Sequence, residues 1–197
     1  MTSLWKPREA CALFVVIAAT ALNAPCPINA ASAEAACADP RYREFDFLIG
    51  DWRVRHRRLL HRLAGCTEWQ TFGGRSRLIK VLGEHGTVDD NWLDLPGGAY
   101  RAVTLRAFDP ASRSWAIWWL DQRHPHRLDP PLIGHFSGGV GRFFADDHFE
   151  GRPIRVRFLW TGTVGGSPRW EQAFSTDGGA SWEANWEMDF CRADRTG

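Results

Sequence analysis

The sequence predicts an all-β domain built as an antiparallel sandwich or barrel of about ten short strands. From Trp52 onward, apolar and polar residues alternate with the period of two that strands produce. Gly and Pro cluster between these runs at turn spacing. No window has the 3.6-residue period of a long amphipathic helix, and Trp, Phe, Val and Ile dominate the runs, as strands favour.

The first expected element is a helical turn over residues 43–50, in which Phe45, Leu48 and Ile49 share a face and Gly50 ends the turn. The strands follow in chain order. They are expected in residues 52–57, 67–74, 75–83, 88–98, 100–110 and 114–121, in two runs around Gly138-Gly139 within 130–153, and in 154–162, 169–175 and 181–192. The run 67–74 is expected to close at Gly73-Gly74 and to form a hairpin with 75–83.

Residues 1–35 read as a signal peptide, and residues 36–197 as the mature domain. Lys6 and Arg8 precede an apolar run at 10–22, which small-x-small cleavage sites follow. That run is too short to span a bilayer, so we expect no membrane span after signal removal and a periplasmic or secreted protein. The formal net charge of +1 gives no general attraction to nucleic acid, and no nucleic-acid partner is expected.

Gly50-Asp51-Trp52 resembles the Gly-x-Trp start of lipocalins and other calycins. With "FDFLIGDWRV", "LRAFDPASRSWAIWWLD" and "WEQAFSTDGGASWEANWEMDFCR", the chain from Phe45 to Arg192 resembles DUF1579. That family comprises calycin-like secreted bacterial proteins without an established activity. The resemblance implies a single antiparallel up-and-down β-barrel with a lipocalin-like or fatty-acid-binding-like interior.

Three cysteines remain after removal of the signal peptide: Cys37, Cys66 and Cys191. Export permits a disulfide. In the closed barrel that the resemblance implies, the last strand pairs with the first, so Cys191 lies near the start of the first strand. Cys37 shortly precedes that start, whereas Cys66 lies toward the opposite rim. The implied pair is Cys37–Cys191.

"FSTDGGASWEANW", residues 174–186, contains a Ser-x-Asp-x-Gly-x-Ser-Trp pattern that resembles the Asp-box of sialidases. Sialidase propellers carry several such boxes, and this chain has one and is too short for several four-stranded blades. Asp177 can accept hydrogen bonds from backbone N–H groups, and Gly178 and Gly179 allow positive φ. We therefore interpret the box as a structural hairpin turn.

The residues predicted to bind a ligand depend on which strand face lies inside. Trp52, Trp119, Trp160 and Trp186 are the candidate cavity walls, and Arg106 and Arg157 are the candidate anchors for a carboxylate or similar group. On the last strand, the face with Trp186 opposes the face with Glu187. Either face can line the interior, and an interior acidic face would bring Glu187 and Glu171 to Arg157 or Arg106.

The sequence contains no nucleophile motif and no phosphate loop, and the spacing His124-x-His126 has no third metal ligand placed beside it, so no cofactor or metal is expected. The function predicted first is binding of a small, partly hydrophobic or amphipathic molecule by an exported barrel. The alternative is a cofactor-independent isomerase, cyclase or hydrolase that uses the cavity, with Glu171 or His135 as its base. A third possibility is a protein-interaction module with a solid interior.

Overall fold

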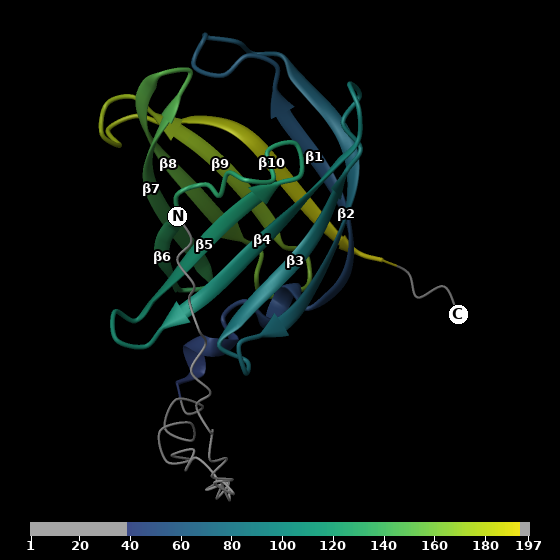
Figure 1. Ribbon diagram of the computed structural model, residues 1–197, viewed down its shortest axis with the longest axis vertical. Coiled ribbons are helices and arrows are strands. Elements are labelled where there is room, and N and C mark those ends of the chain that lie inside the picture. Colours follow the sequence, from purple (N-terminus) through teal and green to yellow (C-terminus); the bar gives the residue numbers. More distant parts are fainter. Residues whose placement is uncertain (1–38, 194–197) are drawn as a thin grey trace, which may run out of the picture.

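The computed structural model describes residues 39–193, which form a closed barrel of ten antiparallel strands preceded by two short helical turns (Figure 1). Each strand pairs with the next strand in the chain, and β10 closes the barrel against β1. The predicted all-β, up-and-down barrel is therefore confirmed. Among the helical turns of residues 39–193, none has the length and apolar character needed to cross a membrane.

The strands range in length from the six residues of β6 to the 13 residues of β2. The 3₁₀ turns are η1 (Pro40–Arg43) and η2 (Asp46–Leu48). The strands are β1 (Gly50–Leu59), β2 (Trp69–Val81), β3 (Gly86–Leu93), β4 (Tyr100–Asp109), β5 (Ser114–Asp121), β6 (Leu132–Ser137), β7 (Val140–Phe149), β8 (Arg152–Thr161), β9 (Arg169–Ser175) and β10 (Glu183–Arg192).

The apolar face of β10 lies inside the barrel. Trp186, Met188 and Phe190 are buried, whereas Glu187 and Asp189 lie on the outer wall and form ion pairs there. The same alternation places the even-numbered residues of β1 inside, from Trp52 to Arg58. This arrangement settles which of the two strand faces lines the interior.

The 3₁₀ turns close one end of the barrel with aromatic side chains. Phe45 is completely buried and contacts the ring of Trp115 edge-on, with centroids 4.9 Å apart. Trp52 donates its indole N–H to the carbonyl of Leu48 over 2.7 Å. The guanidinium of Arg192 covers the Trp52 ring at 3.9 Å from its centroid. Trp52 therefore fixes η2 to the first strand.

The prediction that Gly73 and Gly74 end a strand is wrong, because both lie within the 13-residue β2. Gly74 faces the interior, where a Cβ atom would lie 2.6 Å from Nε2 of His56 and 2.7 Å from the carbonyl oxygen of Trp92. Glycine is therefore required by packing at this position rather than by a turn. The hairpin expected at Gly73-Gly74 is instead formed at residues 82–85, between β2 and β3.

The Asp-box is a hydrogen-bonded turn between β9 and β10. Asp177 accepts hydrogen bonds from the hydroxyl groups of Ser175 (2.7 Å) and Ser181 (2.6 Å) and from the backbone N–H of Ser181 (2.9 Å). These bonds, led by the Ser181 hydroxyl, hold the pKa of Asp177 well below its usual range. Trp182 closes the turn by donating its indole N–H to the carbonyl of Gly179. Every polar group of Asp177 thus serves the turn.

The structure describes two of the three cysteines of the predicted mature domain, Cys66 and Cys191. Arg53 pairs with Cys191, so the last strand does bring Cys191 to the start of the first. Cys66 lies in the loop after β1, and neither Cys66 nor Cys191 forms a disulfide within residues 39–193. Cys37 and the predicted signal peptide lie outside the described residues.

Candidate functional site

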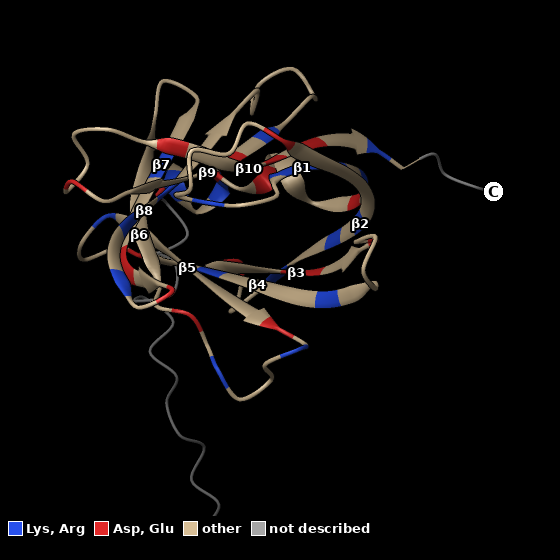
Figure 2. Ribbon diagram, turned by 90° about the horizontal axis from the view of Figure 1, so that it is seen from above, with Lys and Arg blue, Asp and Glu red and all other residues tan. Residues whose placement is uncertain are grey.

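The barrel contains a chamber of about 260 Å³ at the end opposite the 3₁₀ turns, which is the end seen in Figure 2. The loop after β1 and the segment between β5 and β6 frame its mouth. Its lining combines aromatic walls with charged groups of both signs. The principal lining residues are Arg58, Arg62, Tyr100, Trp119, Asp121, Arg123, Asp129, Leu132, Asp147, Phe149, Val156, Phe158, Trp170, Gln172, Phe174 and Trp186.

Aromatic rings in edge-to-face contact form the chamber's inner wall. The ring of Trp186 packs edge-on against Trp119, at 6.0 Å between centroids, and against Trp170, at 5.6 Å. Trp170 in turn packs edge-on against Phe158 at 4.7 Å. Such contacts hold each ring in one orientation. The wall therefore offers a fixed apolar surface to a flat or linear ligand.

Arg58 and Arg62 lie on aromatic rings at the mouth of the chamber. The Arg58 guanidinium is 5.4 Å from the centroid of Trp186, and that of Arg62 is 5.7 Å from the centroids of both Phe149 and Phe174. Burial lowers the pKa of Arg58 and lowers that of Arg62 to about 10. Neither forms an ion pair with a carboxylate of residues 39–193. Both cations are thus available to an anionic group in the chamber.

The remaining charges of the mouth are divided into a paired set and an unpaired set. Arg123 binds Asp121, with Nε 2.9 Å from Oδ1, and its guanidinium covers Tyr100 at 3.7 Å. Asp129 and Asp147 form no ion pair with another described residue. Burial, reinforced by the charge of Asp147, raises the pKa of Asp129. An anionic ligand would therefore bind toward the Arg58 and Arg62 side and away from Asp129 and Asp147.

A second, smaller cavity of about 30 Å³ lies deeper in the barrel and shares Trp119, Phe158 and Trp170 with the chamber lining. A buried ion pair marks this cavity: Nη1 of Arg106 lies 2.8 Å from Oδ2 of Asp89. The other lining residues are Asn91, Thr104, Ile117, Trp160, Met188 and Phe190. The inner cavity can hold only a group the size of a water molecule or a terminal substituent.

His56 supports the chamber wall from the inner face of β1. It is 3% exposed, and its imidazole is stacked on Phe72 with centroids 4.7 Å apart. Trp186 donates its indole N–H to Nδ1 of His56 over 3.2 Å, so the neutral imidazole carries its proton on Nε2. Burial lowers the pKa of His56 to about 4. This histidine is therefore neutral at physiological pH and holds Trp186 in place.

The structure brings four of the six predicted ligand-binding residues to the interior cavities. Trp119 and Trp186 line the chamber, and Arg106, Trp119 and Trp160 line the inner cavity. Trp52 lines neither, because it packs at the closed end. The side chain of Arg157 lies on the outer wall rather than in the cavity, since β8 turns Val156 and Phe158 inward.

Both candidate bases of the enzyme hypothesis lie on the outer wall. Glu171 pairs with Arg157 at 2.8 Å, and His135 is exposed on the outer face of β6. Neither lines the chamber or the inner cavity. The structure therefore places neither residue where it could act on a molecule in the chamber.

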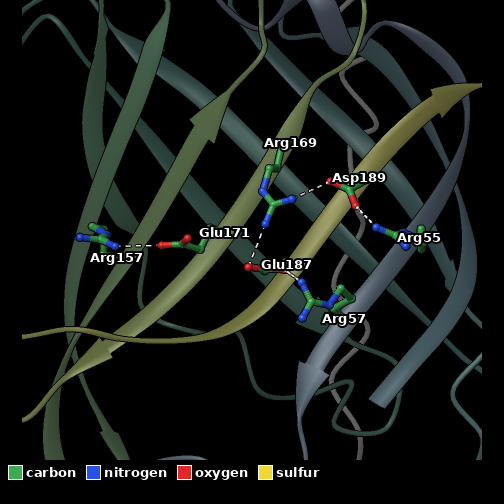
Figure 3. A network of polar contacts seen from close by, with 7 residues as sticks. All are labelled: Arg55, Arg57, Arg157, Arg169, Glu171, Glu187 and Asp189. Atoms are coloured by element: carbon green, nitrogen blue, oxygen red, sulfur yellow. Dashed lines mark hydrogen bonds and ion pairs between the residues drawn. The ribbon is translucent and has the colours of Figure 1, made fainter. Parts of the chain in front are cut away.

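The outer wall of β8, β9, β10 and β1 carries a ladder of alternating charges (Figure 3). Arg169 bridges Glu187 at 2.8 Å and Asp189 at 3.1 Å, and these carboxylates also bind Arg57 and Arg55. Because these groups are partly exposed, each pair contributes little to stability. The basic run at 53–62 is thus divided, since Arg55 and Arg57 belong to this ladder and Arg58 and Arg62 belong to the chamber.

Sequence reasoning missed Arg58, Arg62, Tyr100 and Trp170 as chamber residues. A signal for Arg58 was present, because the alternation of Trp52, Val54 and His56 continues inward to residue 58. Arg62 lies beyond the strand, in a loop whose course no periodicity indicates. In comparisons with known proteins, no family model matches the chain, and no curated protein matches it either.

Proposed function

We propose that this protein binds a small amphipathic molecule in the chamber, with the apolar body of the ligand on the aromatic wall and its anionic group at Arg58 and Arg62. The observation that carries the proposal is the pair of half-buried arginines that face the chamber without a carboxylate partner among residues 39–193. A guanidinium in such surroundings binds a carboxylate or sulfonate more strongly than one in water does.

The chamber walls support the same proposal. Trp119, Trp170 and Trp186 give an apolar surface with fixed ring orientations. Small-molecule sites combine such a surface with a few placed polar groups. A volume of about 260 Å³ suits a ligand of roughly ten to twenty non-hydrogen atoms. The proposal includes export to the periplasm or beyond, which the predicted signal peptide supports, and kinship with DUF1579, which the motifs from Phe45 to Arg192 support.

Titration calorimetry with naphthalene-1-sulfonate tests the proposal. The probe joins a flat apolar body to an anion that stays ionised at all accessible pH values. We expect one site, with affinity weakened about tenfold by Arg58→Met or Arg62→Met, because each change removes a charge-assisted contact and keeps most of the apolar stem. Arg142→Met is the matched control, since it removes the same charge from a residue that is exposed on the outer face of β7. Equal losses in all three variants would refute the proposed site.

A further inference from the structure

The inner cavity adjoins the chamber through shared aromatic walls. Trp119, Phe158 and Trp170 line both spaces. The inner cavity is only about 30 Å³, so a ligand in the chamber can extend no more than a small terminal group into it. Thr104 at the inner cavity lies four residues along β4 from Tyr100 at the chamber mouth, a span of about 13 Å along the strand. Such a ligand is therefore elongated.

Two buried donors at the inner cavity have no acceptor. Nε of Arg106 and Nε1 of Trp160 make no hydrogen bond with any residue of 39–193. Arg106 is 4% exposed and Trp160 is 3% exposed, so both donors are withdrawn from bulk solvent. A buried donor without an acceptor is costly, and a group that accepts from it is correspondingly favoured.

The charge of the inner cavity selects a neutral group. Asp89 already compensates Arg106 through Oδ2 at 2.8 Å. Its Oδ1 accepts from Nδ2 of Asn91 at 2.6 Å and from the backbone N–H of Thr104 at 3.1 Å. A second carboxylate here would lie beside Asp89 with no cation left to compensate it. The uncompensated cations, Arg58 and Arg62, are at the other end of the ligand path.

We propose that the inner cavity is a specificity subsite for a neutral hydrogen-bonding oxygen, such as a hydroxyl, at the end of the ligand opposite its anionic group. This inference rests on the proposed function, because it assumes that the anionic end binds at the chamber mouth. Arg106 Nε and Trp160 Nε1 donate to the oxygen. The ligand class is then an elongated amphipathic acid that carries a second, uncharged polar end.

Matched pairs of straight-chain acids test the subsite: octanoate, decanoate and dodecanoate, each compared with the acid that ends in a primary hydroxyl instead of a methyl group. At the chain length that reaches the inner cavity, we expect the hydroxy acid to bind about fivefold more tightly than its methyl partner. Trp160→Phe removes one donor and keeps an aromatic ring. It should reduce this preference, because the hydroxyl loses one donor that the methyl group does not use.

A second variant, Arg106→Lys, retains a cation beside Asp89 but lacks Nε, and it should also reduce the preference. The subsite is refuted if the hydroxy acids bind more weakly at every length, or if both variants leave the preference unchanged. The methyl acids bind without using the donors of the inner cavity. Their binding without any hydroxyl preference would overturn only the subsite, whereas failure of all six acids to bind would overturn the proposed function and the subsite with it.

Discussion

Trp186 donates its indole N–H to Nδ1 of His56 over 3.2 Å, and this bond couples a buried titratable group to the wall of the chamber. His56 is fixed on its other side by the stacked ring of Phe72, whose plane lies within 5° of the imidazole plane. Protonation of His56 at Nδ1 would remove the acceptor for Trp186 and leave a charge in an apolar surrounding.

The protein should lose stability at acidic pH because of His56. Its pKa falls from 6.5 to about 4 on folding, so the unfolded chain binds more protons between these values. The contribution of neutral His56 to the free energy of unfolding is present above pH 6.5 and is lost as the pH falls toward 4. Between pH 7.5 and pH 5 the loss is about 2 kcal/mol. Urea unfolding at both pH values should show that His56→Phe has the smaller pH dependence, and an equal dependence in both proteins would contradict this assignment.

Alanine should lower stability at only one of the two adjacent glycines of β2. Gly74→Ala forces a Cβ atom to within 2.6 Å of His56 and 2.7 Å of the Trp92 carbonyl, and we expect a loss of about 1–3 kcal/mol in unfolding free energy. The Cβ atom of Gly73→Ala would point outward, and its nearest neighbour would be Oδ2 of Asp94 at 3.7 Å. This substitution should therefore be nearly neutral. Denaturant titration of both variants measures the difference. Similar losses at both positions would show that strand geometry, rather than the space around His56, requires the glycines.

Removal of the Asp-box carboxylate should affect stability and leave ligand binding unchanged. Asp177→Ala deprives Ser175 and Ser181 of their acceptor, so the β9–β10 turn loosens and the melting temperature falls by a few degrees. The turn lines neither the chamber nor the inner cavity. Calorimetry with naphthalene-1-sulfonate should therefore give the same Kd for the variant and the unmodified protein. A large loss of affinity would show that the box takes part in binding.

Affinity for the sulfonate probe should increase as the pH is lowered. The pKa of Asp129 is raised by burial and by Asp147, so the negative charge near the mouth decreases in this direction while the probe stays ionised. Asp147→Asn removes one of these charges permanently. It should bind the probe more tightly at pH 7 and show a weaker pH dependence, measured by calorimetry at fixed ionic strength. An affinity that falls on acidification in both proteins would contradict the placement of the anion.

The fold could be predicted from the sequence largely because alternation and turn residues are local signals. The run from Trp52 to His56 and the Asp-box turn are examples, and the structure has both as expected. The prediction of a turn at Gly73-Gly74 is wrong because a glycine needed for packing looks the same in sequence as one needed for a turn. Packing partners such as His56 lie on another strand, and only the register of the sheet reveals them.

The chamber was harder to predict than the barrel. Trp186 and Glu187 occupy opposite faces of one strand, and the sequence does not show which face lies inside the closed barrel. For the same reason, the sequence does not show that Arg157 lies outside and Arg106 inside. Arg62 reaches the mouth from a loop, where sequence gives no periodicity. The residues that carry charge into the chamber therefore could not be chosen from the sequence alone.

The indole N–H signals of the tryptophans give the most direct test of the central claim that the chamber is the binding site. In ¹⁵N-labelled protein titrated with naphthalene-1-sulfonate, we expect the signals of Trp119, Trp170 and Trp186 to shift, because these residues line the chamber. The signals of Trp92 and Trp182, which line neither interior cavity, should stay in place. Shifts confined to Trp92 or Trp182, with the three chamber signals unchanged at saturation, would contradict the account.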